Sequence, residues 1–322
     1  MMPRLLVTGS SGFVGRHLVN ALVEDPRYGV CALVRRLPDK PPGGVDFQVL
    51  PDFSDLTPQH CAFNGVEAVV HLASRVHVMN ETALDPLDAF RQVNVVQTVL
   101  LARSAAAAGV KRFIFISSVK VNGEQTPPGQ PFRETDTASP VDPYGVSKME
   151  AEEALKLVAS ETGLEVVILR PVLVYGPGVK ANFETMIRWV RKGVPLPFGA
   201  IRNLRSFVAL DNLVSLILTC VEHPAAANQT FLVSDGDDVS TTDLVRRLAY
   251  ALGVEARLIP VPARVLSVVA GVLGRRAFAQ RLCGSLQVDI SKALTLLDWQ
   301  PVISLDKGLG VTAQYFLGEK TE

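Results

Sequence analysis

The sequence lacks a charge imbalance, a cysteine motif and an internal repeat. Lys plus Arg and Asp plus Glu both number 32 in 322 residues, with no block of like charge, which argues against a nucleic-acid or anionic membrane surface as partner. The four cysteines lie far apart, with neither a CxxC pair nor a nearby histidine pair. We therefore expect no zinc or other metal site and no disulfide framework, and a reducing cytoplasm fits best. This composition leaves a compact uncharged or anionic small molecule open as the partner.

Long apolar runs are also absent. The N-terminus has no charged segment and cleavage site ahead of a separate apolar stretch, so we read no signal peptide. The apolar stretch VLSVVAGVLG at 265–274 is about half the length that a bilayer span needs. It predicts a buried helix, with a surface that meets a partner or membrane as the alternative.

Short apolar runs alternate with segments of helical period through about residue 170. Six runs read as strands: RLLVTG, GVCALV, FQVL, AVVHLA, KRFIFISS and EVVILRP. Helical patterns at 13–25, 88–109 and 147–163 lie between them. The alternation predicts an α/β fold, with a doubly wound parallel (Rossmann) sheet in a dinucleotide-binding domain over 1–170 and a smaller α/β substrate lobe over 171–322. Segments near 205–235 are candidates for a return to the core.

The second half of the chain is less regular. We expect a helix at 211–223, a strand at QTFLVS, and helices near 241–252 and 262–282.

The motif TGSSGFVG sets Gly9, Gly12 and Gly15 after the first strand and at the start of the first helix. Such a turn needs glycine where a side chain would block a pyrophosphate, and the helix N-terminus offers free N–H groups. The motif therefore predicts a dinucleotide site.

The end of the second strand bears on the identity of the cofactor. NAD-binding folds place an acidic residue there for the ribose hydroxyls, whereas this chain has Arg35 and Arg36. Two guanidiniums suit a 2′-phosphate, so NADP(H) is favoured over NAD(H). The alternative is that these arginines are a solvated strand end and NAD is bound through backbone contacts.

Tyr144 and Lys148 lie four residues apart in DPYGVSK, on one face of a predicted helix. A phenol has a pKa of about 10, and a nearby ammonium lowers it towards a useful value for proton transfer. The strand FIFISSV ends in Ser117 and Ser118, which strand alternation points in opposite directions. Together these residues predict an acid–base site beside a nicotinamide.

TGSSGFVG, FIFISSV and YGVSK in this order resemble the extended short-chain dehydrogenase/reductase family, in its nucleotide-sugar epimerase, dehydratase and reductase branch. The resemblance implies that Ser118, Tyr144 and Lys148 are catalytic, with Tyr144 as the acid/base. It also implies a set of residues along the cofactor: Gly9, Gly12, Phe13, Val14, Gly15, Arg35, Arg36, Asp52, Phe53, Leu72, Ala73, Ser74, Asn94 and Pro171.

The resemblance extends more loosely to a nucleotide-diphosphate site in the second half. Arg205 would pair with the diphosphate, and the segment VPLPFG at 194–199 would pack on a uracil or thymine base. Of the two histidines in HLASRVH, His77 would be the substrate contact, whereas His71 is assigned to packing or hydrogen bonding. The implied substrate residues are His77, Lys120, Asn122, Asn182, Phe183, Pro197, Arg205 and Leu286.

SSVKVNGE, GPGVKANF and VPLPFG most resemble enzymes of bacterial surface-polysaccharide synthesis, including O-antigen and lipopolysaccharide, that act on UDP-N-acetyl-6-deoxyhexosamines. Leu286, where relatives restricted to plain hexoses carry a bulky aromatic, would leave room for an N-acetyl arm.

Two enzymatic functions share this machinery. The favoured function is NAD(P)H-dependent reduction of a UDP-4-keto-6-deoxy-N-acetylhexosamine, and the alternative is an NAD-dependent UDP-sugar 4-epimerase. A dehydratase is disfavoured because Val119 and Lys120 replace its usual acidic pair. A non-catalytic dinucleotide-binding sensor is the hypothesis of another class. The family resemblance also implies a homodimer with a four-helix contact through 86–108 and 144–162.

Overall fold

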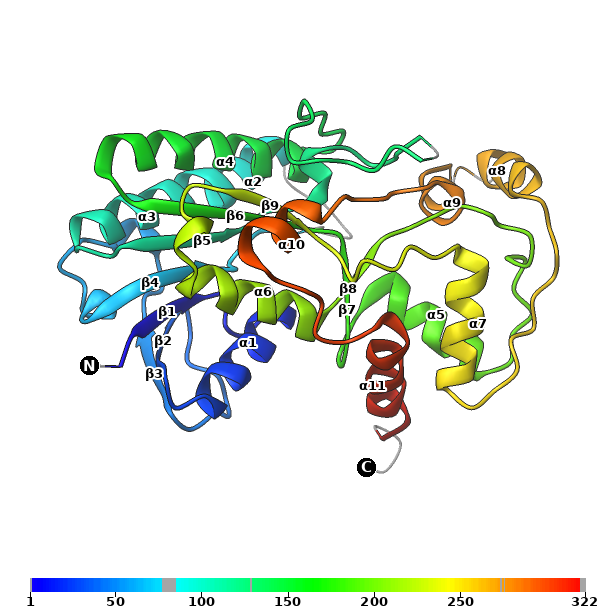
Figure 1. Cartoon of the computed structure of the whole chain (residues 1–322), viewed down its shortest axis with the longest axis horizontal. Coiled ribbons are helices and arrows are strands. Elements are labelled where there is room, and N and C mark those ends of the chain that lie inside the picture. The colour runs from blue at the N-terminus through cyan, green and yellow to red at the C-terminus, as the bar shows by residue number, and fades with distance from the viewer. Residues whose placement is uncertain (1, 77–84, 128, 273, 275, 319–322) are drawn as a thin grey trace.

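The computed structural model describes residues 2–76, 85–127, 129–272, 274 and 276–318. A seven-stranded parallel sheet forms the larger part of the molecule, in the order β3-β2-β1-β4-β5-β6-β9. Its strands are β1 (Arg4–Thr8), β2 (Gly29–Val34), β3 (Val45–Val49), β4 (Val66–His71), β5 (Arg112–Ile116), β6 (Glu165–Pro171) and β9 (Thr230–Val233). The prediction of a doubly wound Rossmann sheet is confirmed (Figure 1).

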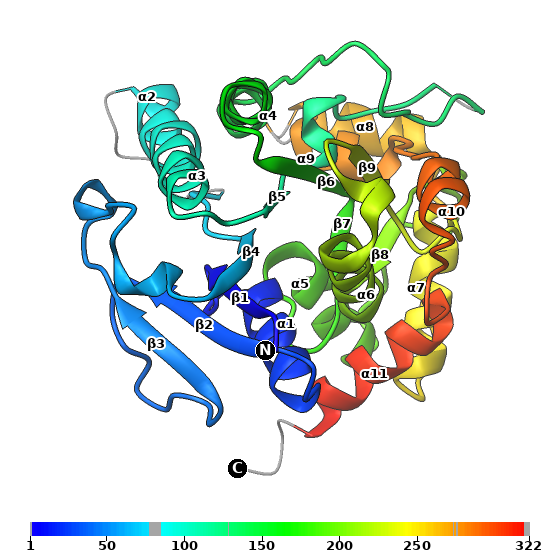
Figure 2. The same cartoon turned by 60° about the vertical axis from the view of Figure 1, so that its left-hand side comes forward.

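Helices cover both faces of this sheet, as Figure 2 shows. On one face lie α1 (Phe13–Glu24) and α6 (Leu210–Glu222), and on the other α2 (Pro86–Arg91), α3 (Gln97–Ala107) and α4 (Pro143–Thr162). Successive residues of β1 enter different cores: Leu5 packs with α1 and α6, whereas Leu6 packs beneath α3 and α4. Burial on both faces explains why the strands read as unbroken apolar runs.

The helical segment predicted over 88–109 is interrupted. Residues Gln92–Val96 form a π-type turn between α2 and α3. Asn94 lies in this turn and is buried. Because π-type turns often occur at functional sites, the interruption indicates Asn94 as a candidate functional residue.

The rest of the chain forms a second lobe with its own core, except that α6, β9 and α10 (Ser291–Leu297) pack on the main sheet. A two-stranded sheet of β7 (Leu173–Tyr175) and β8 (Phe207–Ala209) leads into it. Its helices are α5 (Ala181–Arg191), α7 (Thr241–Ala251), α8 (Ala263–Val272), α9 (Arg276–Cys283) and α11 (Leu305–Gly318). The sequence did not predict α5, α10 or α11.

The stretch 265–274 was predicted to lie in a buried helix, but the helix that it forms is not buried. Its helix, α8, has no fully buried residue, and four valines are exposed on it: Val265, Val268, Val269 and Val272. The prediction failed because apolar composition alone cannot tell a helix covered on all sides from one covered on a single face. None of the described helices combines the length and apolar character that a membrane crossing requires.

Candidate active site

The glycine-rich turn joins β1 to the N-terminus of α1 and is tightly packed. Gly9 has a φ of +70°, and a Cβ on Gly15 would lie 2.1 Å from the Gly9 carbonyl oxygen. A Cβ on Gly12 would meet only that same oxygen, at 3.1 Å. Gly9 and Gly15 are thus required by backbone packing, whereas Gly12 leaves open the approach to the helix N-terminus.

The same turn contains an unpaired polar group. Among the described residues, the Ser10 hydroxyl is buried and has no hydrogen-bond partner. Gly12 caps α1 without a side-chain hydrogen bond to the helix N–H groups. Free donors and an open glycine fit the diphosphate of a dinucleotide.

Two side chains next to the turn belong to different cores. Phe13 packs against the second lobe, and Val14 packs against the core under α1 and α6. The predicted cofactor turn therefore lies where the two parts of the molecule meet.

Beyond β2, Arg35 and Arg36 are both exposed, and neither forms an ion pair within the described part of the chain. Asp52 caps a short turn by accepting a hydrogen bond from the Ser54 amide at 2.8 Å, which holds the pKa of its carboxyl below the ordinary value. Phe53 is buried under α3, so its ring serves packing.

Ser118, Tyr144 and Lys148 come together where β5 ends against α4. Ser118 caps the turn Val119–Val121, and the side chains of Ser118 and Ser74 both act to lower the pKa of the Tyr144 phenol. Lys148 Nζ lies 5.9 Å from the centroid of the Tyr144 ring and donates to the Ile116 carbonyl at 2.8 Å. The arrangement brings one phenol, one hydroxyl and one amine to the same end of the sheet.

The start of α4 explains how the phenol is presented. Asp142 is the N-cap, accepting from the Gly145 amide at 2.7 Å, and Pro143 occupies the first turn. Capping by aspartate and proline at the first position are both strong helix starts. Tyr144 is thereby fixed in the first turn of α4, beside the end of β5.

The pKa values of the two groups run against the sequence prediction. Burial and the Asp142 carboxylate raise the pKa of Tyr144 to about 12, while hydrogen bonding to Ser74 and Ser118 acts in the opposite direction. Burial lowers the pKa of Lys148 to about 7, opposed by the charge of Glu152. Desolvation disfavours both charged forms here. Lys148 is thus not among the groups that lower the pKa of Tyr144 in the protein without a bound nicotinamide.

Behind Lys148 lies a buried ion pair that the sequence analysis missed. Glu152, 1% exposed, accepts from Arg170 Nε at 2.9 Å and from Arg170 Nη2 at 2.6 Å. It also accepts from the Ser117 hydroxyl at 2.5 Å. The signal in the sequence was the spacing: Glu152 follows Lys148 by four residues and so lies on the same helix face.

Asn122 belongs to this network and not to a substrate pocket. Its Oδ1 accepts from Arg170 Nη1 at 3.0 Å, and its Nδ2 donates to the Arg133 carbonyl at 2.8 Å. Both amide atoms are thus satisfied inside the protein, and the residue is buried. Predicting it as a substrate contact was wrong.

Asn94 connects the loop after β4 to α4. Its Oδ1 accepts from the Ser74 hydroxyl at 3.0 Å and from the Arg75 amide at 2.8 Å. Its Nδ2 donates to the Ser147 hydroxyl at 2.9 Å. Asn94 therefore positions Ser74, whose side chain acts to lower the pKa of Tyr144.

The preceding part of this loop is anchored to β1. The Leu72 amide donates to the Thr8 carbonyl at 3.2 Å, and the Ala73 amide to the Thr8 hydroxyl at 3.3 Å. Ala73 is also the backbone that a Cβ on Gly9 would strike, at 2.6 Å. The loop and the glycine turn thus support each other.

His71 and Pro171 lie at the ends of two strands of the sheet. His71 is buried between Thr8 and Thr98, with ring nitrogens 2.7 and 2.9 Å from their hydroxyls. Burial lowers its pKa to about 3, and the predicted packing and hydrogen-bonding role is confirmed. Pro171 is buried at the end of β6, opposite Val233 of β9. His77 lies outside the described residues.

In the second lobe, Arg205 presents a cation without a carboxylate partner among the described residues. Its Nη1 donates to the main-chain oxygens of Arg281 at 2.9 Å and Gly284 at 3.1 Å. Burial lowers the pKa of this guanidinium, and Arg281 adds to the effect. Such a desolvated cation is suited to an anionic ligand.

Lys120 is less free than predicted. Its ammonium pairs with Asp142 and lies 3.6 Å from Glu124. It also lies 5.9 Å from the centroid of the Tyr144 ring. Lys120 therefore borders the site while supporting the N-cap of α4.

The remaining predicted substrate residues do not form one group. Phe183 is buried between Tyr175 and Phe207, with ring centroids 5.6 and 6.4 Å away, and its assignment as a substrate contact was wrong because the ring belongs to the lobe core. Leu286 is 7% exposed and packs in the main core. Asn182 is exposed at the start of α5, and Pro197 is partly buried beside the strand-like segment at 256–262.

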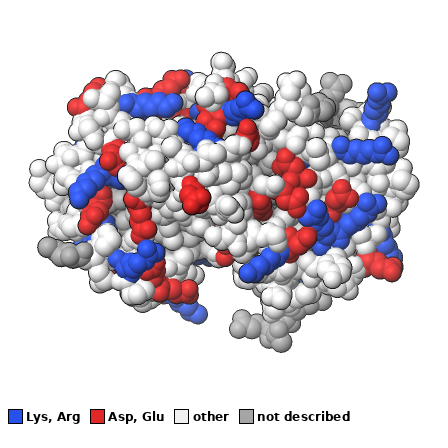
Figure 3. All heavy atoms as spheres, viewed as in Figure 1, with Lys and Arg blue, Asp and Glu red and all other residues white. Residues whose placement is uncertain are grey.

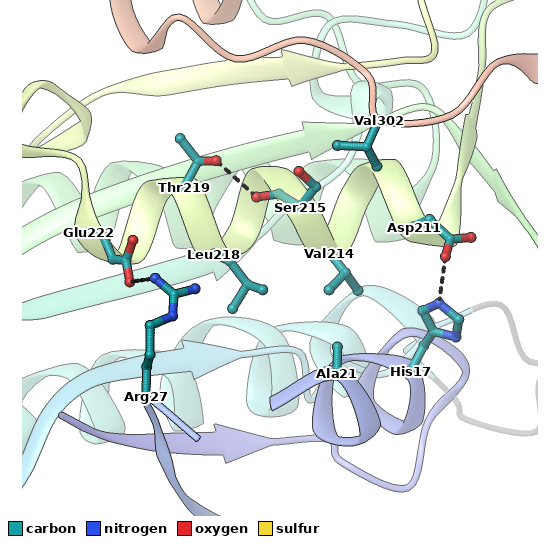
Figure 4. Close-up of a pocket in the computed structure, with 10 residues that line it drawn as sticks. All are labelled: His17, Ala21, Arg27, Asp211, Val214, Ser215, Leu218, Thr219, Glu222 and Val302. Carbon is teal, nitrogen blue, oxygen red and sulfur yellow. Dashed lines mark hydrogen bonds and ion pairs between the residues drawn. The ribbon is translucent and has the colours of Figure 1, made fainter. Parts of the chain in front are cut away.

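A groove of about 400 Å³ runs between α1 and α6 (Figure 4). His17 and Asp211, 3.5 Å apart, close one end, and Arg27 and Glu222, 3.0 Å apart, close the other. None of the predicted site residues lines it. The groove is thus separate from the site around Tyr144.

Comparison with known proteins agrees with this geometry. The model of the NAD dependent epimerase/dehydratase family matches residues 5–234. The chain is 48% identical over 318 residues to a UDP-glucose 4-epimerase of Vibrio cholerae, covering 98% of this chain and 96% of that protein. It is 30% identical to a GDP-6-deoxy-D-mannose reductase of Pseudomonas aeruginosa, covering 96% and 95%.

A solved structure adds to these relatives. The UDP-glucose 4-epimerase of Thermotoga maritima, determined with UDP-glucose, is similar with a TM-score of 0.77 and 25% identity, covering 98% of this chain and 99% of that one.

Proposed function

Because the chain belongs to the NAD-dependent epimerase/dehydratase family, we propose that it is a UDP-sugar 4-epimerase that inverts the configuration of a hexose at C4. The observation that carries the proposal is the 48% identity to the Vibrio cholerae epimerase over almost the whole chain, together with an intact Ser118, Tyr144 and Lys148. The sequence alone favoured the reductase, and the relatives move the preference to the epimerase.

The residues of the glycine turn fit the cofactor. Gly12 and the free N–H groups of α1 would bind its diphosphate, and the loop containing Ala73 and Ser74 would line its nicotinamide half. When bound in oxidised form, NAD would accept the hydride from C4, return it to the other face, and add a positive charge beside the phenol.

Tyr144 would exchange the proton of the C4 hydroxyl. As the sugar is oxidised the phenolate takes this proton, and as the ketone is reduced the phenol gives it back. Ser118 would donate a hydrogen bond to the C4 oxygen as negative charge develops there. The Ser118 side chain lowers the pKa of the Tyr144 phenol, and this proximity supports the action of both groups on one oxygen.

Lys148 would assist by carrying a positive charge near the phenolate. The charge of Glu152 keeps the pKa of Lys148 from falling further below its value of about 7. Glu152 in turn forms a buried ion pair with Arg170, whose Nη2 lies 2.6 Å from its Oε2. The buried pair thus supports catalysis without touching substrate.

The sugar nucleotide would extend into the second lobe. Arg205, which lacks a carboxylate partner among the described residues, would bind the diphosphate. Arg205 forms a β-bridge with Leu286, so the diphosphate would lie beside this residue. UDP-glucose and UDP-N-acetylglucosamine are the substrates to compare, since Leu286 is smaller than an aromatic side chain.

A UDP-4-keto-sugar reductase is the second candidate. It is favoured by Arg35 and Arg36, two exposed guanidiniums at the end of β2 that would suit a 2′-phosphate. The relationship to a GDP-6-deoxy-D-mannose reductase also supports it.

The homodimer is part of the same proposal. α3 and α4 lie side by side on the outer face of the molecule (Figure 2), and Val96 and Leu157 are exposed there. A two-fold contact through these helices would cover Leu157 on α4 and Val96, which directly precedes α3. The cytoplasmic location and the place in surface-polysaccharide synthesis stay predictions.

One experiment separates the candidates. The protein, purified from a heterologous host, would be denatured to release any NAD or NADP, and assayed with UDP-glucose and with a UDP-4-keto-6-deoxy sugar. The epimerase predicts bound NAD and formation of UDP-galactose without net consumption of NAD(P)H. Stoichiometric oxidation of NADPH by the keto sugar, with no UDP-galactose formed, would contradict it.

A further inference from the structure

The helix α8 has two apolar faces, of which only one is covered. Ala263, Leu266 and Ala270 are partly buried, and Leu266 packs against the core of the second lobe. The opposite face presents a continuous stripe at i, i+3, i+4 and i+7, formed by Val265, Val268, Val269 and Val272. We call these four residues the valine stripe.

The valine stripe is not explained by folding. Val268 is 67% exposed and Val272 84% exposed, so neither contributes much to the core. Valine is also a weaker helix former than alanine, leucine or lysine, so these residues do not help the helix form. Four adjacent exposed valines instead suggest that this face is covered by something else.

The charge around α8 differs from that of the rest of the chain. Residues 256–288 contain five arginines and no acidic residue, which leaves 27 basic and 32 acidic residues elsewhere. Arg257, Arg264 and Arg281 are exposed. In Figure 3 the upper right, where Figure 1 places α8, shows blue and white atoms. The equal totals of basic and acidic residues over the whole chain do not show this local excess of positive charge.

We propose that the valine stripe and its arginines form a surface that binds an anionic phospholipid membrane. A helix with an apolar stripe and flanking arginines lies in the interface between headgroups and acyl chains, and each arginine gains from the negative surface potential. The arrangement anchors the protein on the membrane without crossing it.

Two other occupants fit less well. A second copy of the chain in a two-fold contact would bring the arginines of one copy against those of the other, which is unfavourable. A different protein is the second alternative, but the apolar area of four valines is small compared with the ~800 Å² per partner that a stable protein complex buries. An anionic membrane has acyl chains that cover the apolar stripe and negative headgroups that attract the arginines.

The position of α8 connects this surface to the site. Arg205 donates to the main-chain oxygens of Arg281 and Gly284, at the end of α9. α9 follows α8 directly and packs on it. Membrane binding would therefore place the predicted diphosphate-binding residue close to the lipid headgroups.

The test is co-sedimentation of the full chain with vesicles, without any sugar nucleotide. We expect binding to phosphatidylglycerol-rich vesicles, weaker binding to pure phosphatidylcholine, and loss of binding at high salt. The double variant Val268→Glu/Val272→Glu should lower the partition coefficient by about tenfold or more. Arg264→Gln should lower it about fivefold.

Val302→Glu is the matched control, because Val302 is exposed but lies between α10 and α11, and it should bind like the wild type. Unchanged thermal unfolding and circular dichroism of the double variant would show that it folds. Failure of the wild type to bind anionic vesicles, or binding by the double variant as tight as the wild type, would overturn the proposal. So would a wild-type oligomer that the double variant dissociates in the absence of vesicles. These readouts do not depend on which sugar the enzyme uses.

Discussion

Replacing Glu152 by glutamine should both destabilise the protein and change the pH dependence of its turnover. Glu152 and Arg170 are 1% and 5% exposed, and their closest atoms are 2.6 Å apart. Glutamine removes the carboxylate and leaves the Arg170 guanidinium buried without a counter-charge. Breaking a buried pair in this way costs about 3–5 kcal/mol.

A second ion pair, between α3 and α4, provides the control. Arg103 and Glu161 are 2.6 Å apart but exposed. Because exposed pairs contribute about 0–1 kcal/mol, Glu161→Gln should leave stability nearly unchanged. Thermal and urea unfolding of the two variants would be compared under identical conditions, at one fixed level of bound cofactor.

The pH dependence tests the link to Lys148. Loss of the Glu152 charge removes the effect that raises the pKa of Lys148, so its ammonium would deprotonate at lower pH than in the wild type. The loss of turnover in Glu152→Gln should therefore be larger above neutrality than below it. If Glu152→Gln were no less stable than Glu161→Gln, and its pH profile matched the wild type, the reasoning would be refuted.

Three further predictions concern other parts of the site. Arg205→Met should weaken substrate binding by about 2 kcal/mol, a roughly 30-fold rise in KM for the UDP-sugar with little change in kcat, in steady-state assays. Gly15→Ala should unfold at a lower temperature than Gly12→Ala, because its Cβ would lie 2.1 Å from the Gly9 carbonyl oxygen. Both variants should lose bound cofactor. Equal unfolding temperatures of the two variants would contradict the packing account. His71, with its pKa lowered to about 3 against an ordinary 6.5, contributes stability that is complete above about pH 6.5 and is lost as the pH falls towards 3. Acidification to about pH 5 should thus lower the unfolding temperature of the wild type more than that of His71→Gln, and equal shifts would count against this role.

The fold could be predicted from the sequence because local and global signals agree in the first half. Apolar runs of strand length alternate with helical segments, and TGSSGFVG marks the first turn. The extended short-chain dehydrogenase/reductase family, in its nucleotide-sugar epimerase and reductase branch, was identified from motifs in that half, and this is confirmed. The strand β9, although distant in sequence, was visible as the apolar run QTFLVS.

The second lobe was harder to predict, because its contacts are long-range. Tyr175 illustrates this: its hydroxyl donates to Asp235 at 2.8 Å, and a Cβ on Gly308 would lie 2.4 Å from it. Neither contact has a local sequence signature. Asn122 and Phe183 were assigned to substrate for the same reason, since their partners Arg170 and Tyr175 are not evident without the fold.

The site also shows what spacing cannot reveal. The interval from Tyr144 to Lys148 predicted their proximity, but the direction of their pKa shifts depends on burial, which the sequence does not give. Glu152 was unassigned for this reason. Its role follows only from the buried contact with Arg170.

The central claim is that the Tyr144 hydroxyl exchanges the proton at C4 of the sugar. The most direct measurement is UDP-glucose to UDP-galactose conversion by Tyr144→Phe, with its NAD content and thermal unfolding measured on the same preparation. We expect turnover to fall by a factor of about 10²–10⁴ while NAD content and stability stay at wild-type levels. Turnover within about threefold of the wild type in a folded, NAD-loaded Tyr144→Phe protein would contradict the account.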